Sequence, residues 1–452
     1  MSADGRELVA SVLEGLRRAG AHAGDALLVE AESLETRVRG PEIDFVKQAR
    51  ERALGIRAFV AGPGGLSSAN TSTSDLSAAA VERMVGATVA LARATAPDPA
   101  AGLPEGGFAT DAPELGLADA RDRGAPVEDR IAAARAAEAA ARAVDPRIVN
   151  SEGSQAGSEF ARVVYGSTAG FLGGYETASH GLSCEPIARA NGSLQRDSWH
   201  SLAHRLADLE SPESIGRRAG ERALRRLGAR RVRTQEVPVI FDPVTAPSLL
   251  SHLAACVNGY AIYRETSFLG ARRGERVASE LVTVVDDGRL PGGLGSRPFD
   301  GEGLPTRRTE VLARGRLESW LLDAYSARKL GLAPTGNASR GPASAPSVAP
   351  TNLWLLPGEG TLEELVAATP RGLLVTELFG MGFHPVTGDY SRGAAGLWIE
   401  GGEIAHPVEE VTIAGNLGAM LASIDAVAAD LLWLGRIASP SLRVASMTVA
   451  GE

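Results

Sequence analysis

Cysteine is scarce in this chain of 452 residues, which has only Cys184 and Cys256. The two lie far apart and form no Cys-x-x-Cys motif, so the sequence favours neither a disulfide framework nor a zinc–cysteine cluster. Two thiols in a chain of this length are typical of a reducing compartment, and we expect a cytoplasmic protein. The N-terminal segment MSADGRELVASVLEGL carries acids and no long apolar core, which predicts neither a secretory signal nor a transit peptide.

Long hydrophobic runs and an excess of positive charge are also missing. No stretch approaches the roughly 18 consecutive apolar residues that a membrane-spanning helix needs. Acidic residues number 55 and basic residues 46, which gives a formal net charge of −9. Because phosphate binding draws on net or clustered positive charge, direct nucleic-acid binding is not expected as the main activity.

The residues that are present describe an ordinary globular chain with a surplus of glycine. Apolar residues make up 44% and charged residues 22%, which is enough for a large core. The 53 glycines predict many turns and strands rather than a helical bundle. At about 150 residues per domain, the length predicts two or three domains.

Hydrophobic periodicity predicts helices and strands in turn along the first half. Apolar residues recur every four positions from Leu8 to Leu16, as in an amphipathic helix. Residues 53–60 alternate and predict a half-buried strand, with Arg57 and Phe59 on its other face. The polar run SSANTSTSD is expected to lead into a helix, whose apolar stripe consists of Val81, Met84, Val85, Thr88 and Leu91.

The remaining elements place a domain boundary near the middle of the chain. Between the predicted helix and the boundary we expect a loop at 95–124, a helix at 126–143, a β-meander at 147–200 and a helix at 212–228. The boundary near 231–237 divides an N-terminal α/β domain (1–232) from a β-rich C-terminal domain with Gly-rich turns (233–452). Residues 334–352 are predicted to form a long loop, and such loops in compact domains are often functional.

Long ordered blocks of the sequence resemble one family. The string GLLVTELFGMGFHPVTGDYSRGAAGLWIEGGEIAHPVEEVTIAGN at 372–416 is similar to the PmbA (TldE) branch of the TldD/PmbA family. Further similar blocks are ERALGIRAFV (51–60), ASELVTVVDDG (278–288), DGEGLPTRRTEVLARGRL (300–317), PTGN (334–337) and MTVAG (447–451). The resemblance therefore covers most of the chain.

The resemblance implies an architecture and an activity. Members of the family resemble an N-terminal α/β domain followed by a β-rich domain, an α+β fold overall, and they pair as dimers through the C-terminal part. The TldD and PmbA branches together form a zinc peptidase that degrades unfolded or extended peptides. Historical names also connect the family with modulation of DNA gyrase.

The zinc motif of the TldD branch is absent from this sequence. That branch carries HExxxH on a helix after a strand like VPVIFDP, and a cysteine near the C-terminus. Imidazoles and a thiolate hold zinc there, and the glutamate accepts a proton. Registered on Thr266, the equivalent helix here has Leu250, Ser251 and Ala255 at the His, Glu and His positions, and the tail has no cysteine. We therefore expect no catalytic residue, no metal and no cofactor in this chain, and zinc only in a TldD-like partner.

Two pairs of residues have the spacing of metal ligands on a helix, His252 with Cys256 and His200 with His204. His252 and Cys256 are spaced to share one helix face, but packing in or beside a core is the favoured interpretation. His200 and His204 have the same spacing, but no acidic residue stands where an HExxH motif needs one. A zinc site usually has three or four protein ligands, and neither pair has a further cluster nearby.

Segment 376–398 is the strongest binding candidate. The peptide- or partner-binding candidates are Gly380, Gly382, Thr387, Asp389, Tyr390, Ser391 and Arg392. Glycines let another chain approach the backbone, and the polar side chains could clamp it, with the chain adding as a β-strand. The alternative is a local turn in which Asp389 caps N–H groups and pairs with Arg392.

Other chemistries leave weaker signals. No GxSxG motif or phosphate-binding loop is present. Eight arginines between 217 and 233 predict a solvated helix face, or else a patch for nucleic acid or an acidic partner. We expect a metal-free partner subunit of a TldD/TldE-type zinc peptidase. The alternatives are a stand-alone homodimer that binds peptides or proteins without cleaving them, and an enzyme with metal-independent chemistry.

Overall fold

A long antiparallel sheet forms the N-terminal lobe, residues 3–227, in a computed structural model that describes residues 3–451. Its seven strands follow the order β3-β2-β1-β4-β5-β6, and β7 also pairs with β5. The strands are β1 (Ala23–Arg39), β2 (Glu42–Gly62), β3 (Gly65–Thr73), β4 (Ile148–Ser167), β5 (Leu172–Ala190), β6 (Ser193–Arg196) and β7 (Trp199–Ala203). The predicted β-meander at 147–200 is confirmed.

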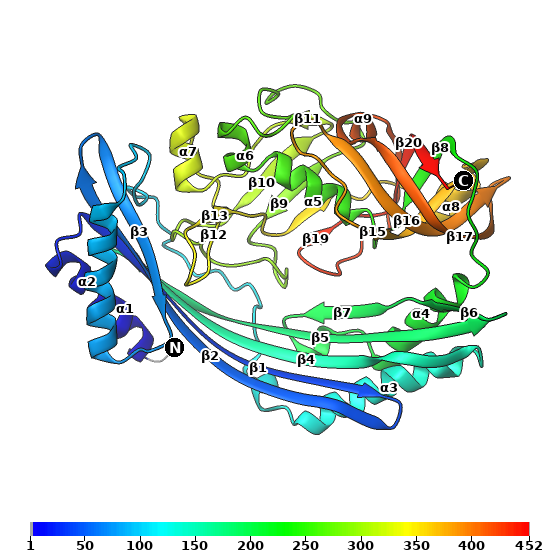
Figure 1. Cartoon of the computed structure of the whole chain (residues 1–452), viewed down its shortest axis with the longest axis horizontal. Helices are drawn as coiled ribbons and strands as arrows, with labels where there is room; N and C mark the ends of the chain where they lie inside the picture. Colours follow the sequence, from blue (N-terminus) through cyan, green and yellow to red (C-terminus); the bar gives the residue numbers. More distant parts are fainter. Residues whose placement is uncertain (1–2, 452) are drawn as a thin grey trace.

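Four helices cover one side of this sheet, in two pairs (Figure 1). They are α1 (Ala3–Arg18), α2 (Ala78–Ala94), α3 (Val127–Val144) and α4 (Pro212–Arg225). The helix predicted around Leu8–Leu16 is confirmed, since its apolar stripe packs on Leu28 and Leu54. At the other end of the sheet, alanines of α3 pack on Leu182 and Cys184.

Three details of the predicted first half are wrong. Arg57 and Phe59 are buried, so this stretch of β2 is covered on both faces rather than half-buried. Residues 67–73 of the polar run form most of β3, whose Ser and Thr residues pair along β2. In α2, Leu91 is exposed and Val89 is buried in its place. The sequence pattern could not show the second layer that covers β2.

Two larger sheets, the two-stranded sheet of β12 and β13, and a large apolar core make up the C-terminal lobe, residues 235–451. One of the larger sheets has the order β17-β16-β15-β8-β20-β18, with β17 also paired to β20, and the other has the order β11-β10-β9-β14-β19. The strands are β8 (Gln235–Phe241), β9 (Val284–Asp287), β10 (Arg308–Ala313), β11 (Arg316–Leu317), β12 (Ala338–Ser339), β13 (Ser347–Val348), β14 (Leu353–Leu355), β15 (Arg371–Phe379), β16 (Asp389–Glu400), β17 (Glu403–Asn416), β18 (Ile424–Val427), β19 (Ile437–Ala438) and β20 (Leu442–Ala450). The α+β class is confirmed.

Short helices connect these strands. They are α5 (Pro247–Cys256), α6 (Gly259–Tyr263), α7 (Ala324–Leu330), α8 (Leu362–Ala367) and α9 (Leu417–Ala422). None of the helices in residues 3–451 is long and apolar enough to cross a membrane. The loop predicted at 334–352 contains only the two-residue strands β12 and β13, which pair with each other.

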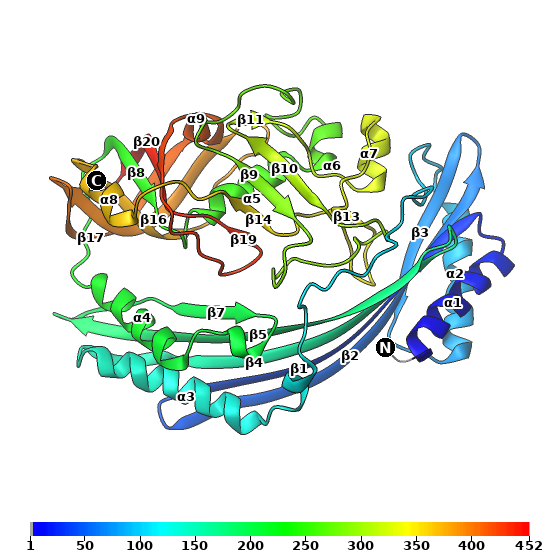
Figure 2. The same cartoon turned by 180° about the vertical axis from the view of Figure 1, so that it is seen from behind.

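The sheet curves around the C-terminal lobe, which lies on the side opposite the helices (Figures 1 and 2). At one end a buried ion network joins the lobes. Asp25 on β1 accepts hydrogen bonds from Arg57 at 2.5 Å and from Arg340 at 2.7 Å. Arg57 also lies 3.4 Å from Glu302. Burial alone would raise the pKa of Asp25, but Arg340 and Arg57 hold it below its ordinary value.

The arginine run holds the other end of the interface. Arg222 donates to the Thr376 carbonyl at 3.2 Å, and Arg226 pairs with Glu377 across the lobes. Arg231, in the segment that links the lobes, pairs with Glu410. The predicted solvated face is therefore wrong for Arg222 and Arg226, whose side chains are buried for the most part, whereas Arg231 is exposed. All three contact the C-terminal lobe, and their charges are already partnered within the chain.

We predict a pH-dependent stability from Glu302. Burial, opposed by Arg57, raises the pKa of this carboxyl from 4.5 to about 7. A group with a raised folded pKa stabilises most below its unfolded pKa, and that contribution is lost as pH rises through the folded pKa. Between pH 6 and 7.5 the unfolding free energy of the wild type should therefore fall by about 1 kcal/mol more than that of Glu302→Gln, since one pKa unit is about 1.4 kcal/mol.

Urea unfolding at the two pH values measures this difference. Glu310→Gln, an exposed position on β10, is the matched control and should leave the pH dependence of the wild type. An unchanged slope in Glu302→Gln contradicts the assignment. Asp25 acts in the opposite direction, but only in more acidic solution, because its pKa is lowered.

Candidate functional site

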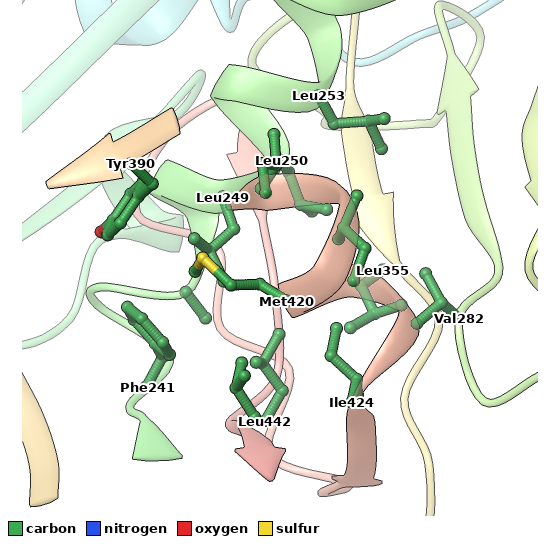
Figure 3. Packing of buried hydrophobic residues seen from close by; sticks show 14 of the residues in the cluster. Phe241, Leu249, Leu250, Leu253, Val282, Leu355, Tyr390, Met420, Ile424 and Leu442 are labelled. Atoms are coloured by element: carbon green, nitrogen blue, oxygen red, sulfur yellow. The ribbon is translucent and has the colours of Figure 1, made fainter. Parts of the chain in front are cut away.

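Helix α5 carries Leu250, Ser251 and Ala255, the three positions that the resemblance predicts to correspond to the zinc motif of the TldD branch. Leu250 points into the C-terminal core and is 2% exposed (Figure 3). Ser251 is exposed, and its hydroxyl donates to the Pro247 carbonyl at 3.0 Å. Ala255 is exposed and offers no donor atom. These residues do not fit zinc, and residues 3–451 contain no group of three or more His, Cys, Asp or Glu that could hold a metal.

His252 and Cys256 on the same helix have different surroundings. His252 stacks on Phe383, with ring centroids 4.4 Å apart, and meets the edge of Tyr390. Burial, together with the nearby Arg392, lowers the pKa of His252 to about 4. Cys256 is fully buried, and burial raises the pKa of its thiol to about 12. A neutral imidazole between aromatic rings and a protonated thiol in the core are packing groups.

The ring nitrogens of His200 and His204 contact backbone carbonyls of the protein. His200 lies on the strand β7, not on a helix, and its Nε2 lies 3.1 Å from the Leu434 carbonyl. His204 contacts the carbonyls of Ala178 and Gly293 with its two ring nitrogens. Both rings therefore help to join the two lobes.

A Ser–His–Asp arrangement lies next to α3, and no sequence motif had indicated it. Ser158 Oγ lies 2.8 Å from His180 Nδ1, and His180 Nε2 lies 3.5 Å from Asp122. Arg130 donates twice to the same Ser158 oxygen, at 3.2 and 3.0 Å. His180 is fully buried, and burial lowers its pKa. Arg130 already occupies the Ser158 oxygen, and His180 Nε2 has no hydrogen-bond partner, so Asp122 does not orient the imidazole as a catalytic triad needs.

The segment between β15 and β16 contains the binding candidates. Gly380 and Gly388 have φ of 72° and 80°, which favour glycine. A Cβ on Gly382 would lie 1.6 Å from the Ser391 carbonyl oxygen, and the Ser391 N–H donates to Gly382 at 2.7 Å. The glycines thus let the loop fold back on its own strand.

Strand alternation separates the polar candidates onto two sides. Asp389 and Ser391 are exposed, whereas Tyr390 is buried and Arg392 lies on the same inner side of the strand. Asp389 accepts a hydrogen bond from Thr387 at 2.7 Å. Among the described residues Arg392 has no ion pair, so the alternative of a local Asp389–Arg392 pair is wrong.

Strand addition has no open edge at this place. Strand β15 pairs with β8 and β16, and β16 pairs with β15 and β17. The first residues of β16, where its pairing with β15 has not yet begun, pair with the loop. The Ser391 N–H donates to the Gly382 carbonyl, and the His384 N–H donates to the Asp389 carbonyl. A peptide could therefore contact this segment only through side chains or the loop.

An apolar surface lies at the tip of the same loop. We call Phe379, Met381 and Val386 the loop tip; their exposed fractions are 44%, 87% and 46%. Exposed clusters of large apolar side chains often mark contact surfaces for another protein. The sequence interpretation named the glycines and polar residues of this loop but missed these three.

A pocket of about 330 Å³ lies on the inner side of the segment, between the lobes. Arg392, Ser248 and Thr245 line it from the C-terminal lobe, and Trp199 and Arg222 line it from the N-terminal lobe. The arginine run that contains Arg222 is the one sequence feature that could have indicated this pocket. Which of those arginines face the other lobe depends on the tertiary fold.

Sequence and structure comparisons identify the class of protein that has this fold. Three family models, described as PmbA/TldA metallopeptidase domain 1, central domain and C-terminal domain, match residues 24–92, 121–227 and 234–451. The chain belongs to the PmbA/TldD family of metallopeptidases, and its similarity is to the PmbA/TldE branch.

Individual relatives cover almost the whole chain. Metalloprotease PmbA of Escherichia coli O157:H7 is 37% identical over 448 residues, which are 99% of this chain and 96% of that protein. A PmbA homologue of Haemophilus influenzae is 35% identical over 450 residues, again 99% and 96%. A Bacteroides thetaiotaomicron structure named a putative modulator of DNA gyrase has a TM-score of 0.91 at 28% identity and covers 100% of both chains. TldE of Thermococcus kodakarensis, at 21% identity and a TM-score of 0.87, covers 98% of this chain and 100% of its own, and it shows the fold alone.

We predict that the purified chain retains no stoichiometric zinc after dialysis. Leu250 faces the core and Ala255 has no donor, so neither of these motif positions can hold a metal. Elemental analysis should find clearly less than one zinc per chain. About one tightly held zinc per chain, lost in the His252→Ala variant, contradicts the prediction and would place a ligand at His252.

Proposed function

We propose that this chain is the metal-free partner subunit of a zinc peptidase that degrades or processes unfolded or extended peptides. The observation that carries the proposal is helix α5, where Leu250 is packed in the core at the position of a motif histidine. Family membership supports the peptidase context, since relatives are named metalloproteases. Residues 3–451 contain no group of side chains that could hold a metal, so in this proposal the metal and the cleavage step belong to an HExxxH-bearing subunit.

The loop tip is the proposed contact with that subunit. Its three apolar side chains stand beside polar atoms of Asp389 and Ser391, as in an interface with an apolar centre and a polar rim. In a heterodimer these side chains would leave water, which stabilises the complex.

The hollow side of the long sheet is the proposed peptide surface of this subunit. A pocket of about 530 Å³ lies along β1, β4, β5 and β7, lined in part by Gly157, Ser179, Gly181 and Ser183. Small side chains leave room for a main chain of any sequence. In the described residues β7 pairs only with β5, which leaves one edge for main-chain hydrogen bonds.

The cytoplasmic location expected from the sequence remains part of the proposal. Cys184 and Cys256 are both free and buried, which fits a reducing compartment. Direct nucleic-acid binding is not proposed, because several arginines of the basic run are paired with the C-terminal lobe.

Co-purification with the HExxxH-bearing paralogue tests the proposal. The expected result is a heterodimer by light scattering that contains zinc and degrades an unfolded protein, whereas this chain alone does not. The alternative function, a stand-alone homodimer that binds peptides, predicts a dimer of this chain that ignores the paralogue. Cleavage by the isolated chain in the presence of chelator contradicts both and favours metal-independent chemistry.

Substitution in the loop tip should weaken assembly. Burying an exposed Met side chain contributes about 1.5–3 kcal/mol, so Met381→Ser should lower partner affinity about 10- to 150-fold. Ile404→Ser, an equally apolar exposed position at the opposite end of the β16–β17 hairpin, is the matched control. Equal dissociation constants for wild type and Met381→Ser, measured by titration with the paralogue, remove the loop tip from the interface.

A further inference from the structure

The interlobe pocket beside Arg392 has more positive charge than its own acids balance. The charged groups in or directly behind it are Arg222, Arg225, Arg226, Arg392, Asp197, Asp242 and Glu377. Arg226 pairs with Glu377, and Arg222 donates to Asp197 at 3.0 Å and lies 3.8 Å from Asp242. Four arginines and three acids give a net charge of +1, and among the described residues Arg225 and Arg392 form no ion pair.

Arg392 is a cation that its own chain does not satisfy. It forms no ion pair among the described residues, and its buried Nε has no hydrogen-bond partner. The buried hydroxyl of Tyr390 lies beside Arg392 and Ser248 on the same side of the strand. Buried donors without partners are costly, so the Arg392 guanidinium is poised for an acceptor that enters the pocket.

The shape and the charge of the pocket favour a carboxylate. A guanidinium matches a planar group with two oxygens. The hydroxyls of Ser248 and Thr245 also line the pocket, but they already donate to the Thr245 carbonyl and to Asp242. One surplus cation balances a monoanion, whereas a phosphate dianion would need a second. Trp199, Leu378 and Leu434 form an apolar wall that can take a side chain next to the carboxylate.

The pocket continues into the surface proposed to hold the peptide. His200 lines both this pocket and the larger pocket on the hollow side of the sheet. A chain lying along β7 would therefore reach Arg392 with its end. An interior acidic side chain offers the same chemistry, but the main chain would then have to continue past the pocket.

We propose that this interlobe pocket binds the C-terminal carboxylate of an extended peptide through Arg392. The inference deepens the proposed function, since it names the part of the peptide that this subunit holds. Binding of a free chain terminus selects short peptides and unfolded chain ends over folded proteins, whose termini are seldom extended.

Binding of three short unstructured peptides to the isolated chain tests the site. The first has a free C-terminal carboxylate, the second has the same sequence with a C-terminal amide, and the third is the amide with one interior Glu. Calorimetry or fluorescence anisotropy should show at least about tenfold weaker binding of the second peptide, because a charge-assisted hydrogen bond is lost. The third peptide should bind as weakly as the second.

Variants connect the effect to Arg392. Arg392→Met should bind the free acid and the amide alike, and Arg392→Lys should keep part of the discrimination because it keeps the charge. Arg371→Met, an exposed arginine at the start of β15, is the matched control and should discriminate like the wild type. If Arg392→Met does not fold, the lysine variant and the peptide pair still decide the matter.

Three results overturn the proposal. Equal affinity of the wild type for the free acid and the amide would show that the carboxylate is not recognised. If Arg392→Met still binds the free acid more tightly than the amide, the carboxylate does not bind in this pocket. Tight binding of the interior-Glu amide removes the C-terminal assignment. The assay contains neither zinc nor the paralogue, so failure of the partner-subunit proposal would appear in assembly and cleavage, not here.

Discussion

The shared burial of Asp25, Arg57, Glu302 and Arg340 is the constraint on which the arrangement of the two lobes depends. These side chains come from two strands of the long sheet and from two segments of the C-terminal lobe, and all are nearly inaccessible to water. Removing Asp25 would leave Arg57 and Arg340 as uncompensated buried charges, which is strongly unfavourable. The network therefore specifies one position of the C-terminal lobe over the sheet, and with it the distance between β7 and Arg392. It also gives the loop at 334–352 its role, because that loop carries Arg340 to Asp25.

Much of the local structure could be predicted from the sequence, because periodicity reports burial directly. The stripe from Leu8 to Leu16 and the alanine-rich helix α3 form where their patterns indicated. The sequence pattern does not show which face of a strand the other lobe covers. Arg57 and Phe59 follow the alternation of a half-exposed strand, but the C-terminal lobe covers their side of β2. Strand β3 looked like a polar lead-in, since its Ser and Thr residues lie at the edge of the sheet and bury little.

The candidate site shows the same division. The absence of zinc ligands and the special backbone of segment 376–392 were both readable from residue identity. The side on which each polar residue lies was not, because it depends on where β16 begins. Asp389 is exposed as the first residue of the strand, and Arg392, three positions later, points toward α5 and the other lobe. Arg222 could not be chosen from eight arginines without the interface. Some of these charges join the lobes, and the surplus lies where an extended peptide could end.

In the proposed function this chain shapes the peptide surface, and its partner subunit carries out the chemistry. The most direct test of this account is peptide cleavage by two reconstituted complexes that both contain this chain unchanged. One has the native zinc subunit, and the other has that subunit with its motif glutamate replaced by glutamine. The account predicts cleavage by the first complex and loss of cleavage in the second, with equal zinc content and equal assembly. Cleavage that persists in the second complex would mean that this chain supplies a catalytic group of its own, and would contradict the account.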